Sequence, residues 1–103
     1  MPERFFRTAA TLDSTTTTVL QVGAQEQLIL TAINACTRTN NSAQVTLKAK
    51  IGSNTYTLVR EVLVDSNEPL GLLTGRLVLD SGDELQASST AALDLWVSGV
   101  IST

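Results

Sequence analysis

The chain has 103 residues, of which 43% are hydrophobic and 17% charged. This length suits one domain with one core, and the apolar share is high enough to offset the entropy lost on ordering, so an intrinsically disordered chain is excluded. Seven basic and ten acidic residues give a net charge of −3. The basic residues are scattered rather than clustered, which disfavours nucleic-acid binding because phosphate contacts need a basic face.

Neither a membrane span nor a signal peptide is indicated. No apolar run approaches the roughly 18 residues of a transmembrane helix, and the start Met1-Pro2-Glu3-Arg4 lacks the basic-then-apolar order of a signal peptide. We therefore expect a soluble protein that is made without export and does not engage a membrane. Cys36 is the one cysteine, so an internal disulfide is excluded and a cysteine-based metal site lacks ligands.

The first segment, residues 1–14, shows no strong periodicity of either the helical or the strand kind. It carries Phe5 and Phe6 and continues into small residues. We interpret it as an N-terminal arm in front of a β-sandwich domain that covers residues 15–103. Two roles for the aromatic pair remain open: the arm anchors in a neighbouring subunit, or it folds back on its own sandwich.

From residue 15 onward, nearly every segment is rich in Val, Leu, Ile and Thr, alternates with a period of two and ends at Gly, Asn, Asp or Ser. This pattern predicts strands separated by turns and leaves no room for a helix of normal length. The predicted strands are Thr15–Val22, Gln27–Cys36, Ala43–Ile51, Thr55–Val64, Leu70–Leu73, Arg76–Leu79, Glu84–Ser89 and Leu93–Ile101. We therefore expect an all-β chain: a single β-sandwich of about eight antiparallel strands, connected as a jelly roll or Greek key.

Two of these strands are the most informative about which face is buried. In Ala43–Ile51 apolar and polar side chains alternate, which predicts one core face and one wet face. In Gln27–Cys36 both alternate sets are largely apolar, which predicts a strand covered on both faces or one whose outer face meets a partner. The residues expected in the core are Leu28, Leu30, Val45, Leu47, Leu95 and Val97.

Residues for catalysis or metal binding are scarce. The sequence contains no histidine, which removes the commonest general base, the Ser-His-Asp arrangement and most zinc chemistry. Asp80, Asp83 and Glu84 form a carboxylate cluster whose oxygens suit a hard cation such as calcium. The loop is shorter than a calcium loop and lacks its other ligands, so a polar turn is the favoured interpretation. We expect no catalytic residue, no metal ligand and no cofactor, and predict that the chain is not an enzyme.

Trp96 is the clearest candidate for an interaction. It lies in the last predicted strand, where the alternation places Leu95 and Val97 inward and Trp96 outward. An outward Trp suits an interface anchor or the rim of its own domain, whereas a sugar-binding platform needs more than one aromatic side chain. Together with Phe5 and Phe6, Trp96 forms our set of candidate interface residues.

Four segments carry a resemblance to a known group of proteins. They are Val19-Leu20-Gln21-Val22-Gly23, Leu28-Ile29-Leu30-Thr31-Ala32-Ile33-Asn34, Leu77-Val78-Leu79-Asp80-Ser81-Gly82-Asp83 and Leu93-Asp94-Leu95-Trp96-Val97-Ser98-Gly99. In these features the chain resembles small β-sandwich proteins of tailed-bacteriophage virions, where a late Gly-Asp turn precedes a final Leu-Asp-x-x-Val-Ser-Gly strand. The likeness spans roughly residues 15 to 101 of the chain, and the Phe5-Phe6 segment has no counterpart in it.

The resemblance implies a non-enzymatic structural protein of the virion, assembled in the host cytoplasm, and first of all a capsid decoration or cement protein that stabilises the coat lattice through repeated contacts. Its implied partners are further copies of the chain, in a homo-oligomer, and the major capsid protein or neighbouring virion proteins. The alternatives are a neck or tail component and a receptor- or carbohydrate-binding module that uses the sandwich loops. A hydrolase is disfavoured, because it needs two acids at a fixed separation in a cleft.

Overall fold

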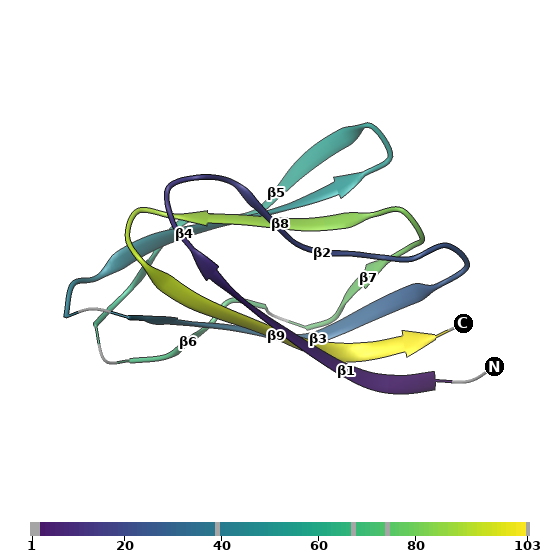
Figure 1. Ribbon diagram of the computed structural model, residues 1–103, viewed down its shortest axis with the longest axis horizontal. Coiled ribbons are helices and arrows are strands. Elements are labelled where there is room, and N and C mark those ends of the chain that lie inside the picture. The colour runs from purple at the N-terminus through teal and green to yellow at the C-terminus, as the bar shows by residue number, and fades with distance from the viewer. Residues whose placement is uncertain (1–2, 39, 67, 74, 103) are drawn as a thin grey trace.

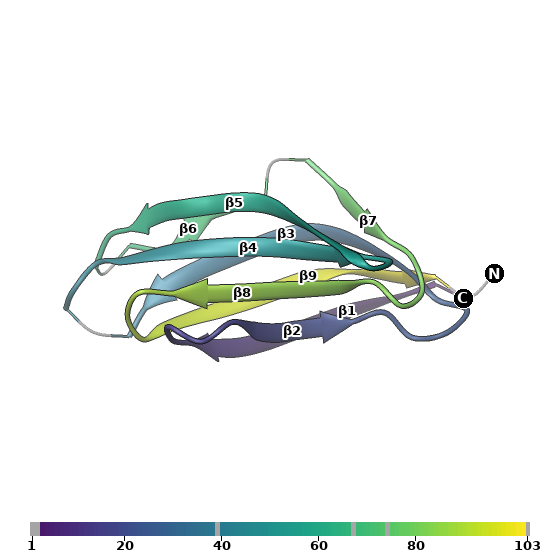
Figure 2. The ribbon, with the colours of Figure 1, turned by 90° about the horizontal axis from the view of Figure 1, so that it is seen from above.

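Two antiparallel sheets face each other in the computed structural model, which describes residues 3–38, 40–66, 68–73 and 75–102 (Figure 1). The strands are β1 (Glu3–Leu12), β2 (Thr17–Gln21), β3 (Gln27–Thr37), β4 (Ala43–Ile51), β5 (Asn54–Val64), β6 (Leu70–Gly71), β7 (Leu77–Leu79), β8 (Glu84–Ser89) and β9 (Leu93–Ser102). Sheet A has the order β1-β9-β3-β6, with β7 also paired to β3, and sheet B has the order β2-β8-β4-β5. Figure 2 shows β5, β4, β8 and β2 side by side in that order, with sheet A behind them.

The order of the strands is that of a jelly roll. The short strands β6 and β7 pair with different parts of β3, β6 with Asn34 and Ala35 and β7 with Leu28 to Leu30, so together they occupy the place of one interrupted edge strand. Apart from the β4–β5 hairpin and the β6–β7 connection, successive strands alternate between the two sheets. The predicted all-β sandwich with jelly-roll connections is therefore confirmed. Within the described ranges, no helix is long and apolar enough to cross a membrane.

The eight predicted strands correspond to β2 through β9, with ends that agree to within two residues. The strand that sequence analysis did not predict is β1, which lies where the N-terminal arm was expected. It pairs with β9 along its whole length, from Glu3 opposite Ser102 to Leu12 opposite Leu93. The segment therefore folds back on its own sandwich, the second of the two alternatives considered, and residues 3–12 are an edge strand of sheet A. Its alternation was hidden because its inward positions have mixed polarity: Phe6, Thr8, Ala10 and Leu12.

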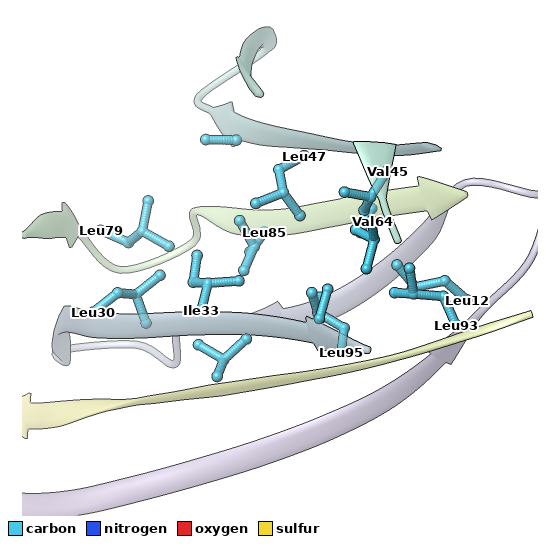
Figure 3. Close-up of a cluster of buried hydrophobic side chains, with 14 of the residues drawn as sticks. Leu12, Leu30, Ile33, Val45, Leu47, Val64, Leu79, Leu85, Leu93 and Leu95 are labelled. Atoms are coloured by element: carbon cyan, nitrogen blue, oxygen red, sulfur yellow. The ribbon is translucent and has the colours of Figure 1, made fainter. Parts of the chain in front are cut away.

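The core consists of aliphatic side chains that the two sheets place between them (Figure 3). Full burial of one such side chain contributes about 1.5–3 kcal/mol. The residues expected in the core are all buried: Leu28, Leu30, Val45, Leu47, Leu95 and Val97. The alternation of β4 is confirmed as well, since its apolar positions are buried up to Ala49 and the intervening ones are not.

The structure corrects the expectation that β3 is apolar on both faces. The register between β3 and β9 shifts between Leu30 and Ala32. Leu30 points into the core before the shift and Ile33 does so after it, each at 1% exposure or less. A bulge of one residue exchanges the faces of a strand. The two apolar sets that appeared to lie on opposite faces therefore lie mostly on the same inner face, on either side of the bulge, while Ile29 and Ala32 lie on the outer face.

Candidate functional site

The carboxylates of the β7–β8 turn have separate structural partners. Asp83 is 8% exposed, and its Oδ2 accepts a hydrogen bond from the Asp80 amide at 2.9 Å. Asp80 Oδ1 accepts one from Gln27 Nε2 at 3.0 Å, and Glu84 Oε1 accepts one from Thr18 Oγ1 at 3.1 Å. These contacts agree with the favoured interpretation of a polar turn. In the part of the chain that the structure describes, no three His, Cys, Asp or Glu side chains are grouped so as to hold a metal ion.

A cleft of about 320 Å³ opens between the edges of β1 and β2, where the two sheets part. Its walls are mainly apolar side chains that pack against the core, among them Phe6, Leu20 and Ile101. Glu26 is the carboxylate in the lining: its Oε1 accepts a hydrogen bond from the Gly23 amide at 3.2 Å, and its Oε2 lies 3.5 Å from Arg4 Nη2. The described lining therefore contains one engaged acid and not the pair that glycoside hydrolysis needs.

The pleat of the sheet separates the candidate interface residues. Phe5 and Phe6 are neighbours on β1, so their side chains leave opposite faces. Phe5 is 91% exposed on the outer face of sheet A, whereas Phe6 packs against the core. Trp96 is 41% exposed and faces outward, as the alternation predicted, opposite Ala9 of β1. The structure thus brings Phe5 and Trp96 to one face and places Phe6 on the other.

Four strands of sheet A each contribute one residue to a row of apolar side chains on this outer face. Phe5 lies opposite Val100, Val100 opposite Ile29, and Ile29 opposite Val78. Opposite residues of paired strands share a face and have Cβ atoms about 4.5–5.5 Å apart, so these four residues form a continuous apolar row. Its two ends are the most exposed, Phe5 at 91% and Val78 at 50%.

Sequence reasoning named neither Val78 nor Val100, and it reached Ile29 only through the prediction that the outer face of Gln27–Cys36 is covered or meets a partner. The available signal was that Val100 has the same parity as the outward Trp96 on the last strand. Alternation within one strand tells which face a residue is on, but not which residue of the neighbouring strand lies opposite. The row follows from the register of four strands, and that register depends on tertiary pairing.

Trp96 is a further exposed apolar side chain on this face of β9, separated from the apolar row by Ser98. It lies four residues from Val100 on the same face, a distance of about 13 Å at the usual rise of a strand. The side chains next to Trp96 at this end of the face are polar. Asp94 Oδ1 accepts a hydrogen bond from Thr11 Oγ1 at 3.1 Å and lies 3.5 Å from Arg38 Nε. Apolar anchors with a polar rim are typical of a protein–protein interface.

The middle of the outer face of sheet B is polar. Two rows of residues run across it in register, Gln21-Glu84-Lys50-Thr55 and Thr18-Gln86-Lys48-Thr57. Every member is polar or charged, as expected for a face in contact with water. Sheet B also exposes large apolar side chains, but these lie on β5 and at the end of β4: Ile51, Tyr56, Leu58 and Leu63. The outer face of sheet A is the candidate interaction face because its apolar row crosses four strands and Trp96 lies on the same face.

Comparison of the chain with protein-family models, with curated proteins and with solved structures finds no match in any of the three sets. The jelly-roll topology and the apolar row on the outer face of sheet A are therefore the observations that bear on the role of the chain.

Proposed function

We propose that the chain is a non-enzymatic structural protein of a tailed-phage virion, most simply a capsid decoration or cement protein, which docks through the outer face of sheet A. The observation that carries this proposal is the apolar row, which crosses four strands of sheet A, together with Trp96 on the same face. Contiguous exposed apolar patches on soluble proteins mark surfaces for partners. The expected partners are coat subunits and further copies of the chain.

The energetics of this face suit repeated contact rather than one tight contact. Burying a side chain such as Phe5 contributes about 1.5–3 kcal/mol, and association has to offset the loss of translational and rotational freedom. A few apolar anchors therefore give a weak single contact. Repetition around a symmetric lattice turns such contacts into stable attachment, because each further contact forms at a high effective concentration.

The fold and the resemblance support the same role by analogy. Jelly rolls occur in viral capsid domains and in lectins, and a fold alone does not determine function. The four segments that resemble phage virion proteins favour the capsid over the lectin. The site favours it too, because the exposed aromatic residues Phe5, Tyr56 and Trp96 lie on strands and not on the loops, where a carbohydrate-binding module is expected to hold its ligand.

The test is to locate the chain on virions of a phage that encodes it, by mass spectrometry of purified particles and immunogold electron microscopy. A regular array over the head supports a decoration protein, and a ring at the neck or label on the tail supports the alternative neck or tail component. Absence of the chain from the particles overturns the virion role.

A second measurement tests the docking face itself. Purified chain is added to undecorated heads, and bound protein is measured by co-sedimentation. We expect the variants Val78→Ser and Trp96→Ser to bind less than the unaltered chain, because each removes an apolar anchor from the face. Gln86→Ser, on the outer face of sheet B, is the matched control and should bind normally. Equal binding by all three variants contradicts docking through sheet A.

A further inference from the structure

The edges of the two sheets differ in how they are protected against pairing with another chain. At the edges of sheet B, β2 has five residues and a register shift between Thr18 and Leu20, and β5 pairs with β4 through two shifts. The far edge of sheet A consists of β6, with two residues, and β7, with three. Short strands and bulges are the usual means of preventing edge-to-edge association.

β1 has neither form of protection. It is ten residues long and pairs with β9 in one unbroken register from Glu3 to Leu12. In an antiparallel pair only alternate residues direct their backbone groups at the partner, so about half of the N–H and C=O groups of β1 face away from β9. A long, regular edge of this kind is a template for a further strand.

The charges of β1 indicate what that further strand is. On the outer face, Glu3 and Arg7 lie two residues either side of Phe5, and within the described part of the chain neither forms an ion pair. Arg4 is on the other face, where its Nη2 lies 3.5 Å from Glu26 Oε2 of the same chain. The outer face of β1 therefore carries an acidic, an aromatic and a basic side chain in that order. When a second copy of β1 runs antiparallel, the acidic side chain of each copy lies opposite the basic side chain of the other.

We propose that β1 pairs with β1 of a second copy of this chain, antiparallel, about a two-fold axis that passes between the two Phe5 residues. In this register Glu3 lies opposite Arg7 of the second copy, and Arg7 lies opposite its Glu3, on either side of the paired Phe5 rings. Directly opposite charges of unlike sign stabilise a strand pair, and aromatic pairs add to it. A two-fold contact is isologous, so every favourable pair occurs twice.

Other registers lack this complementarity. A two-fold axis at Arg7 sets two guanidinium groups opposite each other, and like charges in that position are destabilising. An axis at Ala9 places Arg7 opposite Thr11 and leaves both outer-face charges, Glu3 and Arg7, without a counterpart. The outer-face residues of β1 therefore select the axis at Phe5.

The pairing also joins the candidate interaction faces of the two copies. Phe5 is the end of the apolar row that crosses sheet A to Val78. With the axis at Phe5, the apolar rows of the two copies run into one another across a single continuous sheet. The inference does not depend on a virion role, because it rests on the edge and the charges of β1 alone.

Charge reversal tests the proposed register in the full-length protein, with the dimer dissociation constant measured by analytical ultracentrifugation. The unaltered chain should dimerise, and Arg7→Glu should raise the dissociation constant by about tenfold or more, because it sets two like-charged pairs opposite each other. Glu3→Arg should do the same. Combining Glu3→Arg with Arg7→Glu exchanges the charges and should restore dimerisation. Lys48→Glu, on the outer face of sheet B, is the matched control and should leave the constant unchanged.

Disulfide cross-linking in a Cys36→Ser background tests the axis independently. Residues opposite each other in an antiparallel pair have Cα atoms about 4.5–5.5 Å apart, within the range that a disulfide spans. Phe5→Cys should therefore give a covalent dimer on mild oxidation. Arg7→Cys should not, because its equivalent in the second copy is displaced by about 13 Å along the strand.

Three results overturn the proposal. The first is a monomer at every concentration at which the protein stays soluble. The second is a dimer that is unaffected by the single charge reversals. The third is efficient cross-linking through Arg7→Cys with none through Phe5→Cys. Each of these leaves docking of the sheet A face on a capsid intact, since that role is measured on heads with Val78→Ser and Trp96→Ser.

Discussion

Gly99 of β9 lies directly against the backbone carbonyl oxygen of Ile29 in β3, so closely that a Cβ atom at position 99 would overlap that oxygen. Gly99 is buried and sits opposite Leu30, the last residue before the register of β3 and β9 shifts. The absence of a side chain at this point lets β9 pass close to the bulged strand. The Ser-Gly step in the last strand thus has a packing reason.

Gly99→Ala should lower the free energy of unfolding by about 1–3 kcal/mol, the range for forcing an extra carbon into a packed interior. Denaturant titration measures the loss. Gly71→Ala is the matched control: a Cβ there would meet Asn34 Oδ1 at 3.5 Å, an ordinary contact, so its stability should stay the same or rise slightly. If both variants are equally stable, the close approach of Gly99 to Ile29 is refuted.

A second prediction concerns the turn between β2 and β3. Gln25 has φ of 63°, a left-handed conformation that costs a residue with a side chain about 1 kcal/mol or more. It is the third residue of a turn closed by a hydrogen bond from the Glu26 amide to the Gly23 carbonyl at 3.3 Å, and glycine is favoured at such a position.

Gln25→Gly should therefore raise the free energy of unfolding by about 0.5–1 kcal/mol. Ala24→Gly, at the preceding position, should lower it, because there glycine only increases the entropy of the unfolded chain. Thermal unfolding followed by circular dichroism measures whether each variant is more or less stable than the unaltered chain. A loss of stability in both variants would falsify the assignment of the turn.

The sequence predicted β2 through β9 because apolar residues and turn residues alternate there in strand periods. It did not predict β1, because Thr8 and Ala10 occupy inward positions at an open edge of the sandwich, where a polar or small residue is tolerated. It also misassigned the faces of β3. A bulge such as the one after Leu30 is set by the neighbouring strand, and nothing in a single strand's own alternation marks it.

A third prediction concerns Asp83, which holds the β7–β8 turn through its bond to the Asp80 amide. Asp83→Ala should cost about 1–2 kcal/mol of stability, since it removes a hydrogen bond to a mostly buried carboxylate. Asp83→Asn should cost less, because the amide oxygen can still accept the bond. Neither calcium nor a chelator should change the melting temperature of the unaltered chain. A rise with calcium would show that the turn is a metal site.

The candidate site was predictable only in part, because the face on which a residue lies can be predicted only where its strand is recognised. Trp96 was correctly placed outward, because the buried Leu95 and Val97 on either side define its face. Phe5 and Phe6 were treated as one anchor, because without a strand assignment the pleat that separates them is not visible. In a strand, adjacent side chains point to opposite faces of the sheet. Phe5 therefore belongs to the apolar row, and Phe6 to the wall of the cleft.

The last prediction uses Trp96 as a reporter, since it is the one tryptophan of the chain and is 41% exposed on the candidate interaction face. Docking of that face on a capsid covers Trp96, so acrylamide should quench its fluorescence less in the bound state. Pairing through β1 leaves Trp96 uncovered, because Trp96 lies opposite Ala9, whereas the described residues that the Phe5 axis sets opposite each other are residues 3–7.

Quenching should therefore stay constant as the protein is diluted from dimer to monomer, and fall only on binding to heads. The Trp96→Phe variant, measured on heads, supplies the background from the coat proteins. Quenching that changes on dilution instead means that the two copies meet through their sheet faces and not through the edges. In that case the apolar row is the dimer interface, and docking on the lattice must use a different surface.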